Sequence, residues 1–555
     1  MIRTAWLTGM LVAAFAWTLA AAEPSLQVLE EDGDGLLYNH MMEIMRRQFA
    51  ERREDLQTAL VSVEKAEQRR RRQRAEFRQM LGEFPEPTPL NPQVTGTIDR
   101  EGYRIERVVY ESRPCHHVTA NLYVPDGDGP FPGVLVPCGH SRNGKASAAY
   151  QAACIRMVRQ RLIVLIFDPI SQGERHQIAV LPPPNAKVGS PRPSPTVEHI
   201  LVHPGALLVG RNTGHYILWD GIRSMDYLAG RPEVDAKRLG MSGNSGGGTM
   251  TTWQMAIDDR IVAAAPSCFI TTLQRIYEEL GPSDGEQQFP DMGLKGLDHA
   301  DFLMMRAPRP TMILAARQDF FPFDGTLQAY DEAKRFFAVY GKADHVGLFV
   351  HDDKHGWSRP RRMAAERFMR RWLLDQQEPI ASEADFEQEV LPDGQLQVTK
   401  TGQVIEEYSN EITVPQITLK KARELASARE RFWGTGDRAA HIAKVRELLA
   451  LDRAKGIVQT ELLGEVSENG YTIKMLLIRR DGFPIPALLF TPDKSEPDAM
   501  PALLVDSRGM AQAAEAAGGP LQLRLAAGRV VLAVDVRGYG ETRDTKSRAY
   551  NDEFR

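Results

Sequence analysis

The sequence has few cysteines, no strong excess of charge and no regular spacing of metal-binding side chains, and each shortage excludes a class of protein. All four cysteines lie between Cys115 and Cys268 of a 555-residue chain, which is not the density of a disulfide scaffold. A formal net charge of −5 with 25% charged residues is typical of an ordinary enzyme surface, so we expect no nucleic-acid partner. We also expect neither a metal nor any other cofactor.

One long apolar run occurs, and it lies at the start of the chain. Arg3 precedes an apolar stretch from Ala5 to Ala16, and the small residues Ala20-Ala21-Ala22 follow. This pattern predicts a signal peptide over residues 1–22 and a secreted or periplasmic protein. An uncleaved membrane anchor is the alternative, because the run approaches the ~20 residues that a span requires. After cleavage, no stable membrane insertion is expected.

A possible nucleophile lies in the pentapeptide Gly243-Asn244-Ser245-Gly246-Gly247. The segment 238–242 before it predicts a strand, and the segment from Gly248 to Met255 predicts a helix. Small residues around Ser245 permit the sharp strand-to-helix turn that exposes a nucleophilic serine. Because Gly-Ser-Gly runs are also common in ordinary turns, the prediction of Ser245 as the nucleophile depends on this context.

A serine hydroxyl becomes a good nucleophile only when a histidine accepts its proton and a carboxylate orients that histidine. Suitable residues follow the serine in the order Asp, His. Asp319 comes after the buried-strand pattern 310–316, and His355 lies in the loop after the next predicted strand. We predict these two as the catalytic acid and base. The alternatives are Asp324 and His351, and the second of these stands directly at a strand end.

The oxyanion of an acyl-transfer intermediate needs two backbone N–H donors. We expect one from Gly246, which follows the nucleophile, and one from His140 or Ser141 in the loop after strand 131–136. This loop, residues 139–145, is similar to the nucleophile motif of glucuronoyl esterases. We reject Ser141 as the nucleophile because the loop comes one pair of strands too early and lacks the glycine that an elbow requires.

Several further stretches follow one family pattern. They are Asp168–Arg175 (Asp-Pro-Ile-Ser-Gln-Gly-Glu-Arg), the predicted helix Trp219–Leu228, Arg231–Asp235 and Asp319–Pro322. Together with the elbow, they make residues 91–378 similar to α/β-hydrolases of the acetyl xylan esterase and cephalosporin-C deacetylase kind. The resemblance implies an α/β fold with a doubly wound, mostly parallel sheet, a triad of Ser245, Asp319 and His355, and ester hydrolysis without a cofactor.

The segments around this domain have characters of their own. Residues 23–90 show helical periodicity, and residues 379–425 are acidic and are predicted to be a linker. Residues 177–212 are rich in proline and form an insertion between a predicted strand and the helix that leads to the elbow. A long insertion in that place is typical of a lid over the substrate, although a packed surface loop is the alternative.

The last part of the chain, residues 426–555, repeats the beginning of the hydrolase-like domain. Matching stretches keep their order and spacing: Gly102–Ile105 with Gly470–Ile473, Pro132–Val136 with Pro501–Val505, Val164–Asp168 with Val531–Asp535, and Gly173-Glu174 with Gly540-Glu541. The repeat predicts a tandem, partial second α/β-hydrolase-like unit that lacks a triad. It is either the beginning of a longer copy or a remnant without catalytic function.

These observations predict an exported serine esterase that acts on polysaccharide or oligosaccharide esters, most simply by deacetylating xylan or related saccharides. A glucuronoyl esterase and a peptidase of the prolyl oligopeptidase type are the alternatives that share the chemistry. An inactive hydrolase fold used for binding is the alternative without chemistry, and the Ser, Asp, His order argues against it.

Overall fold

The computed structural model describes most of the chain. The described residues are 26–30, 33–178, 193–281, 283–287, 289–378, 386–451, 458–468, 470–480, 482–496, 498–515 and 518–544. The predicted signal peptide and residues 179–192 of the predicted Pro-rich insertion lie outside them. By compactness, the described residues of Met1–Met41 and Arg446–Lys546 form a first unit, and those of Met42–Val445 form a second. The domain boundaries inferred from the sequence stay predictions.

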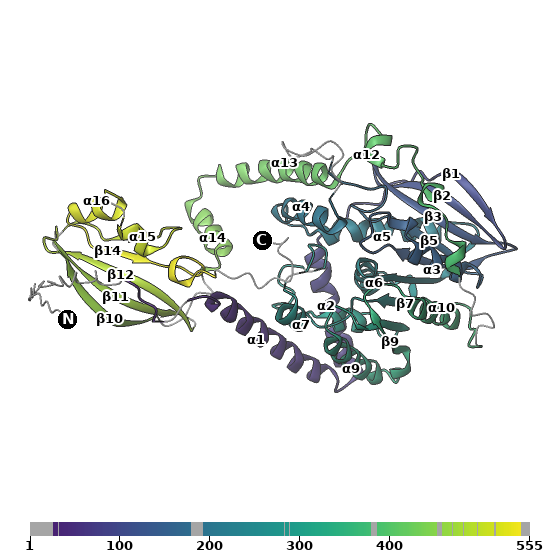
Figure 1. Ribbon diagram of the computed structural model, residues 1–555, viewed down its shortest axis with the longest axis horizontal. Coiled ribbons are helices and arrows are strands. Elements are labelled where there is room, and N and C mark those ends of the chain that lie inside the picture. The colour runs from purple at the N-terminus through teal and green to yellow at the C-terminus, as the bar shows by residue number, and fades with distance from the viewer. Residues whose placement is uncertain are drawn as a thin grey trace, which may run out of the picture. The chain divides into compact units, whose positions relative to one another are not determined.

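The second unit is built on a nine-stranded sheet (Figure 1). Its strands are β1 (Gln93–Arg100), β2 (Tyr103–Arg113), β3 (His116–Pro125), β4 (Phe131–Pro137), β5 (Ile163–Phe167), β6 (Val234–Asn244), β7 (Ile261–Ser267), β8 (Thr311–Gln318) and β9 (Val346–Lys354). They lie in the order β1-β2-β3-β5-β4-β6-β7-β8-β9. The pairs β1–β2, β2–β3 and β3–β5 are antiparallel. The strands β5, β4, β6, β7, β8 and β9 run parallel to one another. This confirms the predicted α/β-hydrolase fold.

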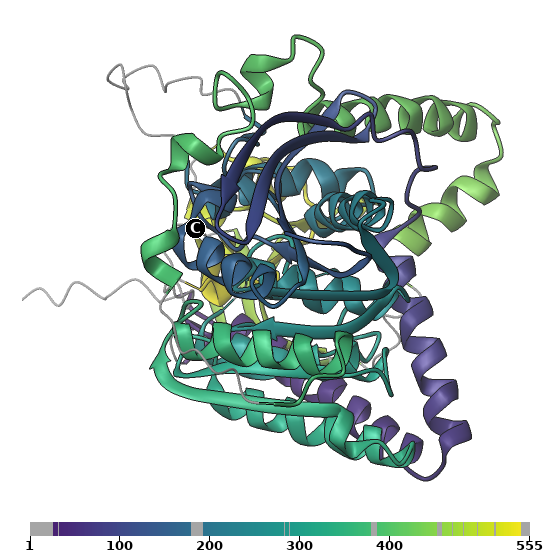
Figure 2. The same cartoon turned by 90° about the vertical axis from the view of Figure 1, so that its right-hand side faces the viewer.

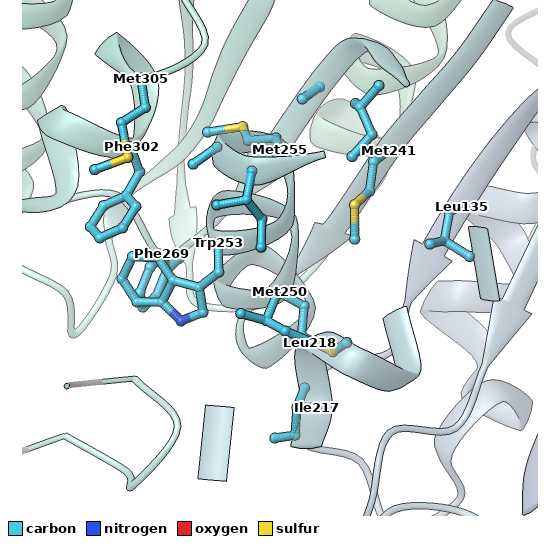
Figure 3. Close-up of a cluster of buried hydrophobic side chains, with 14 of the residues drawn as sticks. Leu135, Ile217, Leu218, Met241, Met250, Trp253, Met255, Phe269, Phe302 and Met305 are labelled. Atoms are coloured by element: carbon cyan, nitrogen blue, oxygen red, sulfur yellow. The ribbon is translucent and has the colours of Figure 1, made fainter. Parts of the chain in front are cut away.

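Helices cover both faces of this sheet, and each face has its own apolar core (Figure 2). One face carries α3 (Ala148–Val158) and α10 (Arg359–Leu373), and the other carries α5 (Thr213–Ala229), α6 (Gly246–Ile257), α8 (His299–Met304) and α9 (Phe323–Val339). Trp253 of α6 packs against Phe269 and Phe302, with ring-centroid distances of 5.3 and 4.2 Å (Figure 3). Every residue of α6 is buried, which fixes the turn that precedes it.

Two N-terminal helices, α1 (Leu36–Ala59) and α2 (Val63–Leu81), confirm the helical character predicted before the sheet. From Met42 onward they pack on the second unit. The buried Arg52 of α1 donates to Asp301 at 2.6 Å and to Glu332 at 2.8 Å. Phe77 of α2 is fully buried, with its ring centroid 4.8 Å from that of Phe302.

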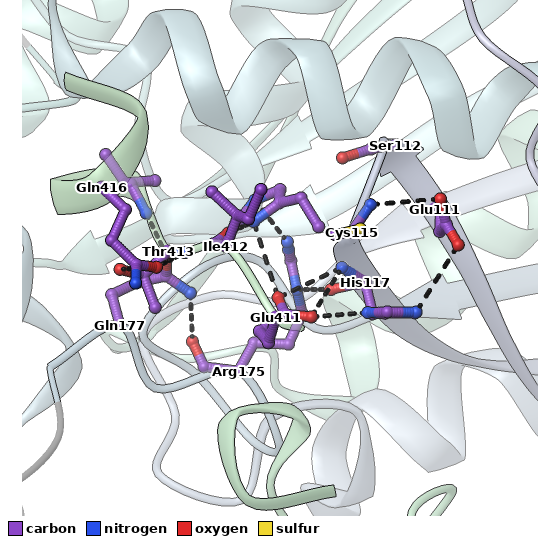
Figure 4. Close-up of polar contacts among 12 residues, drawn as sticks. Glu111, Ser112, Cys115, His117, Arg175, Gln177, Glu411, Ile412, Thr413 and Gln416 are labelled. Carbon is purple, nitrogen blue, oxygen red and sulfur yellow. Dashed lines mark hydrogen bonds and ion pairs between the residues drawn. The ribbon is translucent and has the colours of Figure 1, made fainter. Parts of the chain in front are cut away.

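The chain after α10 runs back over the second unit. This part of the chain contains α11 (Asp393–Leu396), α12 (Val404–Glu407), α13 (Val414–Trp433) and α14 (Arg438–Leu448). Two further helices of the unit lie earlier in the chain, α4 (Pro195–Leu208) and α7 (Leu273–Glu279). Glu411 accepts a 2.5 Å hydrogen bond from His117 Nδ1, and Val414 N donates to Gln177 Oε1 at 2.9 Å (Figure 4). The described part of the predicted linker is therefore fastened to the second unit.

The first unit contains a five-stranded sheet. Its elements are β10 (Gln459–Glu468), β11 (Tyr471–Arg480), β12 (Phe483–Pro492), β13 (Ala502–Leu504), α15 (Met510–Glu515), α16 (Pro520–Ala526) and β14 (Val531–Val534). The order β10-β11-β12-β14-β13 and its pairing directions are the same as in β1-β2-β3-β5-β4. The register even shifts at the corresponding glycines, Gly96 and Gly464.

Among the described residues, no helix combines the length and the apolar character that a membrane span requires.

Candidate active site

Ser245 occupies the turn between β6 and α6, where the elbow pattern predicts it. Its backbone has φ 57° and ψ −124°, a conformation that is strained for any residue with a side chain. Glycines make the turn possible. A Cβ on Gly243 would lie 2.6 Å from the Gly247 carbonyl oxygen, and one on Gly247 would lie 2.2 Å from the Pro137 carbonyl oxygen. The packing thus holds Ser245 at the carboxyl end of a central strand.

Asp319 and His355 lie together just beyond the carboxyl ends of β8 and β9. His355 Nδ1 is 2.8 Å from Asp319 Oδ1. The aspartate side chain is 4% exposed and the histidine side chain 22%, so the acid is shielded while the ring reaches the surface. Of the alternatives, Asp324 lies in the first turn of α9, and His351 pairs with Asp353 at 3.2 Å. The structure therefore brings together the two side chains that we predicted as acid and base.

The histidine loop is tied to the elbow by the residues next to each. With its amide nitrogen directed at the loop, Asn244 donates to the Gly356 carbonyl at 3.1 Å and to Ser267 Oγ at 2.8 Å. The buried thiol of Cys268 also donates to the Gly356 carbonyl, at 3.6 Å. Burial and the nearby Asp319 raise the pKa of this thiol to about 12, so Cys268 is a neutral packing group. Since Asn244 precedes Ser245 and Gly356 follows His355, these bonds join the turn that carries Ser245 to the loop that carries His355.

The loop after β4 is attached to the elbow through Tyr150. Its hydroxyl accepts a 2.8 Å hydrogen bond from Gly139 N and donates one of 2.8 Å to the Asn244 carbonyl. The tyrosine is buried, and burial raises its pKa well above the ordinary value, so the hydroxyl keeps its proton. This bridge sets the distance between the predicted oxyanion loop and the turn at Ser245.

The amides predicted for the oxyanion hole differ in their availability. Ser141 N donates to Gln172 Oε1 at 3.2 Å, and the Ser141 hydroxyl donates to Asn143 Oδ1 at 2.6 Å. Neither His140 N nor Gly246 N donates to any residue that the structure describes. A Cβ on Gly246 would lie 2.9 Å from His140 Nε2, so the two residues are adjacent. Of the two amides considered for the loop, that of His140 is available.

A buried charge cluster holds the loop after β4, residues 139–145, in place. Lys145 Nζ lies 2.6 Å from Asp168 and 2.5 Å from Glu174, and Asp168 Oδ1 accepts from Lys145 N at 2.7 Å. Gly144 and Gly173 both have positive φ and would place a Cβ within 2.3 Å of Asp168 Oδ1. The contacts of Asp168 and Glu174 thus shape the loop rather than the predicted reacting centre.

A second polar cluster borders the elbow, and sequence reasoning missed it. Glu286 Oε1 lies 2.7 Å from His140 Nε2, and Oε2 lies 3.1 Å from His199 Nδ1. Burial lowers the pKa of His199, but its attraction to Glu286 outweighs this and raises it to about 9. Burial and repulsion from Glu286 raise the pKa of Asp284 to about 6. His199 belongs to the described part of the segment that we predicted as a lid.

Parts of this chain are similar in sequence or structure to known proteins. The pattern of the prolyl oligopeptidase family matches residues 208–377, which include Ser245, Asp319 and His355. A protein of Bacillus subtilis (strain 168), "Putative hydrolase YtaP", is 23% identical over 312 residues, which are 55% of this chain and 100% of that protein. The structure of methylesterase BT1017 matches with a TM-score of 0.54 at 21% identity, over 69% of this chain and 81% of its own. A glucuronoyl esterase from Solibacter usitatus matches with a TM-score of 0.41 at 16% identity, over 54% of this chain and 91% of its own.

Proposed function

We propose that this protein is an exported serine esterase that hydrolyses carbohydrate esters, with acetyl groups on xylan or related saccharides as the substrate class. The observation that carries the proposal is the His355–Asp319 pair, held at 2.8 Å beside a strained serine turn. Export follows only from the composition of residues 1–22.

The reaction follows from the roles of these side chains. Ser245 Oγ attacks the ester carbonyl while His355 accepts its proton, and Asp319 holds the ring in the productive tautomer and stabilises the imidazolium. The amides of Gly246 and His140 stabilise the oxyanion, each contributing about 3 kcal/mol to the transition state. His355 then protonates the leaving alcohol, and water hydrolyses the acyl-enzyme by the same steps.

Two alternatives share this chemistry. The match to the prolyl oligopeptidase family favours a peptidase. The elements that the structure describes before β1 are helices rather than the propeller expected of that family, which favours an ester substrate. The likeness to a protein named methylesterase also supports an ester.

For the first unit we propose a partial copy of the hydrolase-like domain that has no catalytic role of its own. Its support is the shared strand order and the repeated aspartate cradle. Asp535 accepts from Met510 N and Glu541 N as Asp168 accepts from Lys145 N and Glu174 N.

The first experiment compares Ser245→Ala with the wild type on p-nitrophenyl acetate, acetylated xylan, a glucuronoyl ester and a prolyl peptide. We expect ester activity that falls by about 10⁶ in the variant, because triad members act as a unit. Circular dichroism should show an unchanged fold.

Ser141→Ala is the matched control, since Ser141 lies in the other serine-containing loop and its hydroxyl bonds only within that loop. It should keep the ester activity. A loss of activity in this control, with Ser245→Ala still active, would assign the nucleophile to Ser141. Activity on the prolyl peptide alone would replace the esterase proposal with a peptidase.

A further inference from the structure

Three ionisable side chains converge beside the elbow from three separate parts of the chain. His140 comes from the loop after β4, His199 from α4, and Glu286 from the segment 283–287. Their ligand atoms all lie within 4.8 Å of one another. His199 is 1% exposed and Glu286 is 2% exposed. The proposed ester hydrolysis uses none of these three side chains, so their burial requires a separate explanation.

The outer nitrogen of each ring faces an acceptor. His199 Nε2 lies 2.9 Å from the Ile170 carbonyl oxygen, which can only accept, so this nitrogen carries a proton. His140 Nδ1 lies 3.6 Å from the Asp284 carboxylate, which favours a proton on that nitrogen. In the neutral rings, the lone pairs are therefore on His199 Nδ1 and His140 Nε2, the two nitrogens that face inward.

The group that these inward nitrogens face is itself an acceptor. Glu286 Oε1 is 2.7 Å from His140 Nε2, and Glu286 Oε2 is 3.1 Å from His199 Nδ1. With neutral rings, His199 Nδ1 and Glu286 Oε2 are two buried acceptors that face each other at 3.1 Å without a donor between them. Such a cluster is stable only when a cation lies among its acceptors, either a proton on His199 Nδ1 or a metal ion.

We propose that His140 Nε2, His199 Nδ1 and the Glu286 carboxylate bind one divalent transition-metal ion of the zinc class. Two imidazoles and one carboxylate are a ligand set that suits Zn²⁺, whereas Mg²⁺ and Ca²⁺ prefer oxygen ligands. Histidines that bind metals usually donate their other N–H to a carbonyl or a carboxylate. The Ile170 carbonyl and Asp284 stand in those two places.

The dimensions of the cluster suit such an ion. Tetrahedral zinc with bonds of about 2.0–2.2 Å requires ligand atoms roughly 3.3–3.6 Å apart. The two nitrogen–oxygen distances, 2.7 and 3.1 Å, are slightly shorter, so small side-chain rotations would open the site to this size.

The packing around the cluster restrains the backbone that carries Glu286 before any ion binds. Trp253 Nε1 donates to the Glu286 carbonyl at 3.1 Å. A Cβ on Gly285 would lie 2.5 Å from the His203 ring, so the glutamate loop has no space for a side chain there.

His140 Nε2 lies against Gly246, which places the ion next to the proposed nucleophile turn. Three protein ligands leave one coordination position for an oxygen of a bound substrate. Binding of the ion does not depend on the proposed ester hydrolysis.

The test measures metal content rather than activity. The full chain is stripped with a chelator, equilibrated with Zn²⁺, dialysed, and assayed by inductively coupled plasma mass spectrometry and by titration calorimetry. We expect one zinc per chain in the wild type. Glu286→Gln should weaken zinc binding at least tenfold, because the amide keeps the shape of the carboxylate but loses its charge. Diffraction at the zinc edge should give an anomalous peak between His140 and His199.

His199→Ala provides a second loss of a ligand, and thermal unfolding of each variant verifies that it is folded. His345→Ala is the matched control, because this histidine bonds the Pro308 carbonyl at the other end of β9 and should not affect zinc binding. Equal zinc content in the wild type and Glu286→Gln would overturn the proposal. So would an anomalous map without a peak at the cluster, which would leave protonated histidines as the cation.

Discussion

At the scale of single residues, the proximity of the predicted acid and base was accessible to sequence reasoning because each follows a predicted strand. Parallel neighbours place their carboxyl ends at one edge of the sheet, so Asp319 and His355 could be expected to meet, and they lie 2.8 Å apart. Tyr150, His199 and Glu286 could not be found in this way. Their positions depend on tertiary packing of a helix and two loops, for which no local pattern exists.

Asp319→Asn should lower kcat roughly 10⁴-fold on p-nitrophenyl acetate, because an amide cannot hold the histidine in the productive tautomer. The Asp319 side chain is only 4% exposed, so bulk water has little access to it. The matched variant is Asp324→Asn, in the first turn of α9, which should leave kcat nearly unchanged. A larger loss from Asp324→Asn would assign the acid to that residue.

Tyr150→Phe should lower kcat by about 10²-fold without moving the pH dependence of the reaction. The variant removes both hydrogen bonds that join Gly139 to the Asn244 carbonyl, so the predicted oxyanion loop loses its register with the elbow. A misplacement of about 1 Å is worth this much in rate. Steady-state kinetics from pH 5 to 9 provide the measurement. A shifted pH profile would instead make Tyr150 a proton-transfer group.

At the scale of elements, the segment from α11 to α13 is hydrogen-bonded to the second unit and is not a free linker. Buried Glu174 accepts from Val398 N at 2.8 Å and from Thr399 N at 2.7 Å, and it also pairs with Lys145. The acidic, glycine-containing sequence of this segment predicts a linker, because a charge pattern carries no information on a partner more than two hundred residues away.

Glu174→Gln should reduce the free energy of unfolding by about 3 kcal/mol at pH 7, as expected when one partner of a buried ion pair is removed. Burial raises the pKa of Glu174, but Lys145 and the bonds from Thr399 outweigh it and hold the pKa below the usual 4.5. A depressed folded-state pKa stabilises the protein above pH 4.5, and this contribution is lost as the pH falls through the folded pKa.

Urea unfolding at pH 7 and pH 4 should therefore show a smaller difference between wild type and Glu174→Gln at the lower pH. Glu407→Gln is the control, since Glu407 makes an exposed bond to Thr401 N in the same segment. A difference that is the same at both pH values would contradict the ionised role of Glu174.

At the scale of the whole molecule, the fold class, the N-terminal helices and a smaller second sheet were all predictable from strand patterns and from the repeat. The repeated glycine–tyrosine and aspartate stretches fall at matching places in the two sheets. The composition of the units was not predictable, because residues 26–30 and the start of α1 group with the C-terminal sheet. The association of these two distant segments produces no periodic pattern in the sequence of either one.

A chain shortened to residues 26–445 should keep kcat/KM close to that of the full protein, because every predicted site residue belongs to the second unit. Kinetics on p-nitrophenyl acetate and a cooperative thermal transition would establish this. A folded fragment with greatly reduced kcat/KM would instead show that the first unit contributes to the site.

The pairing of two segments far apart in the sequence within the first unit also limits when this unit can form during biosynthesis. Glu541 binds the amides of Val28 and Leu29, and 513 positions separate Val28 from its partner. A ribosome that adds about 5–20 residues per second completes that span in roughly 25–100 s. The nine-stranded sheet can therefore assemble while translation proceeds, whereas the contact of the five-stranded sheet with residues 28 and 29 can form only after Glu541 has been added.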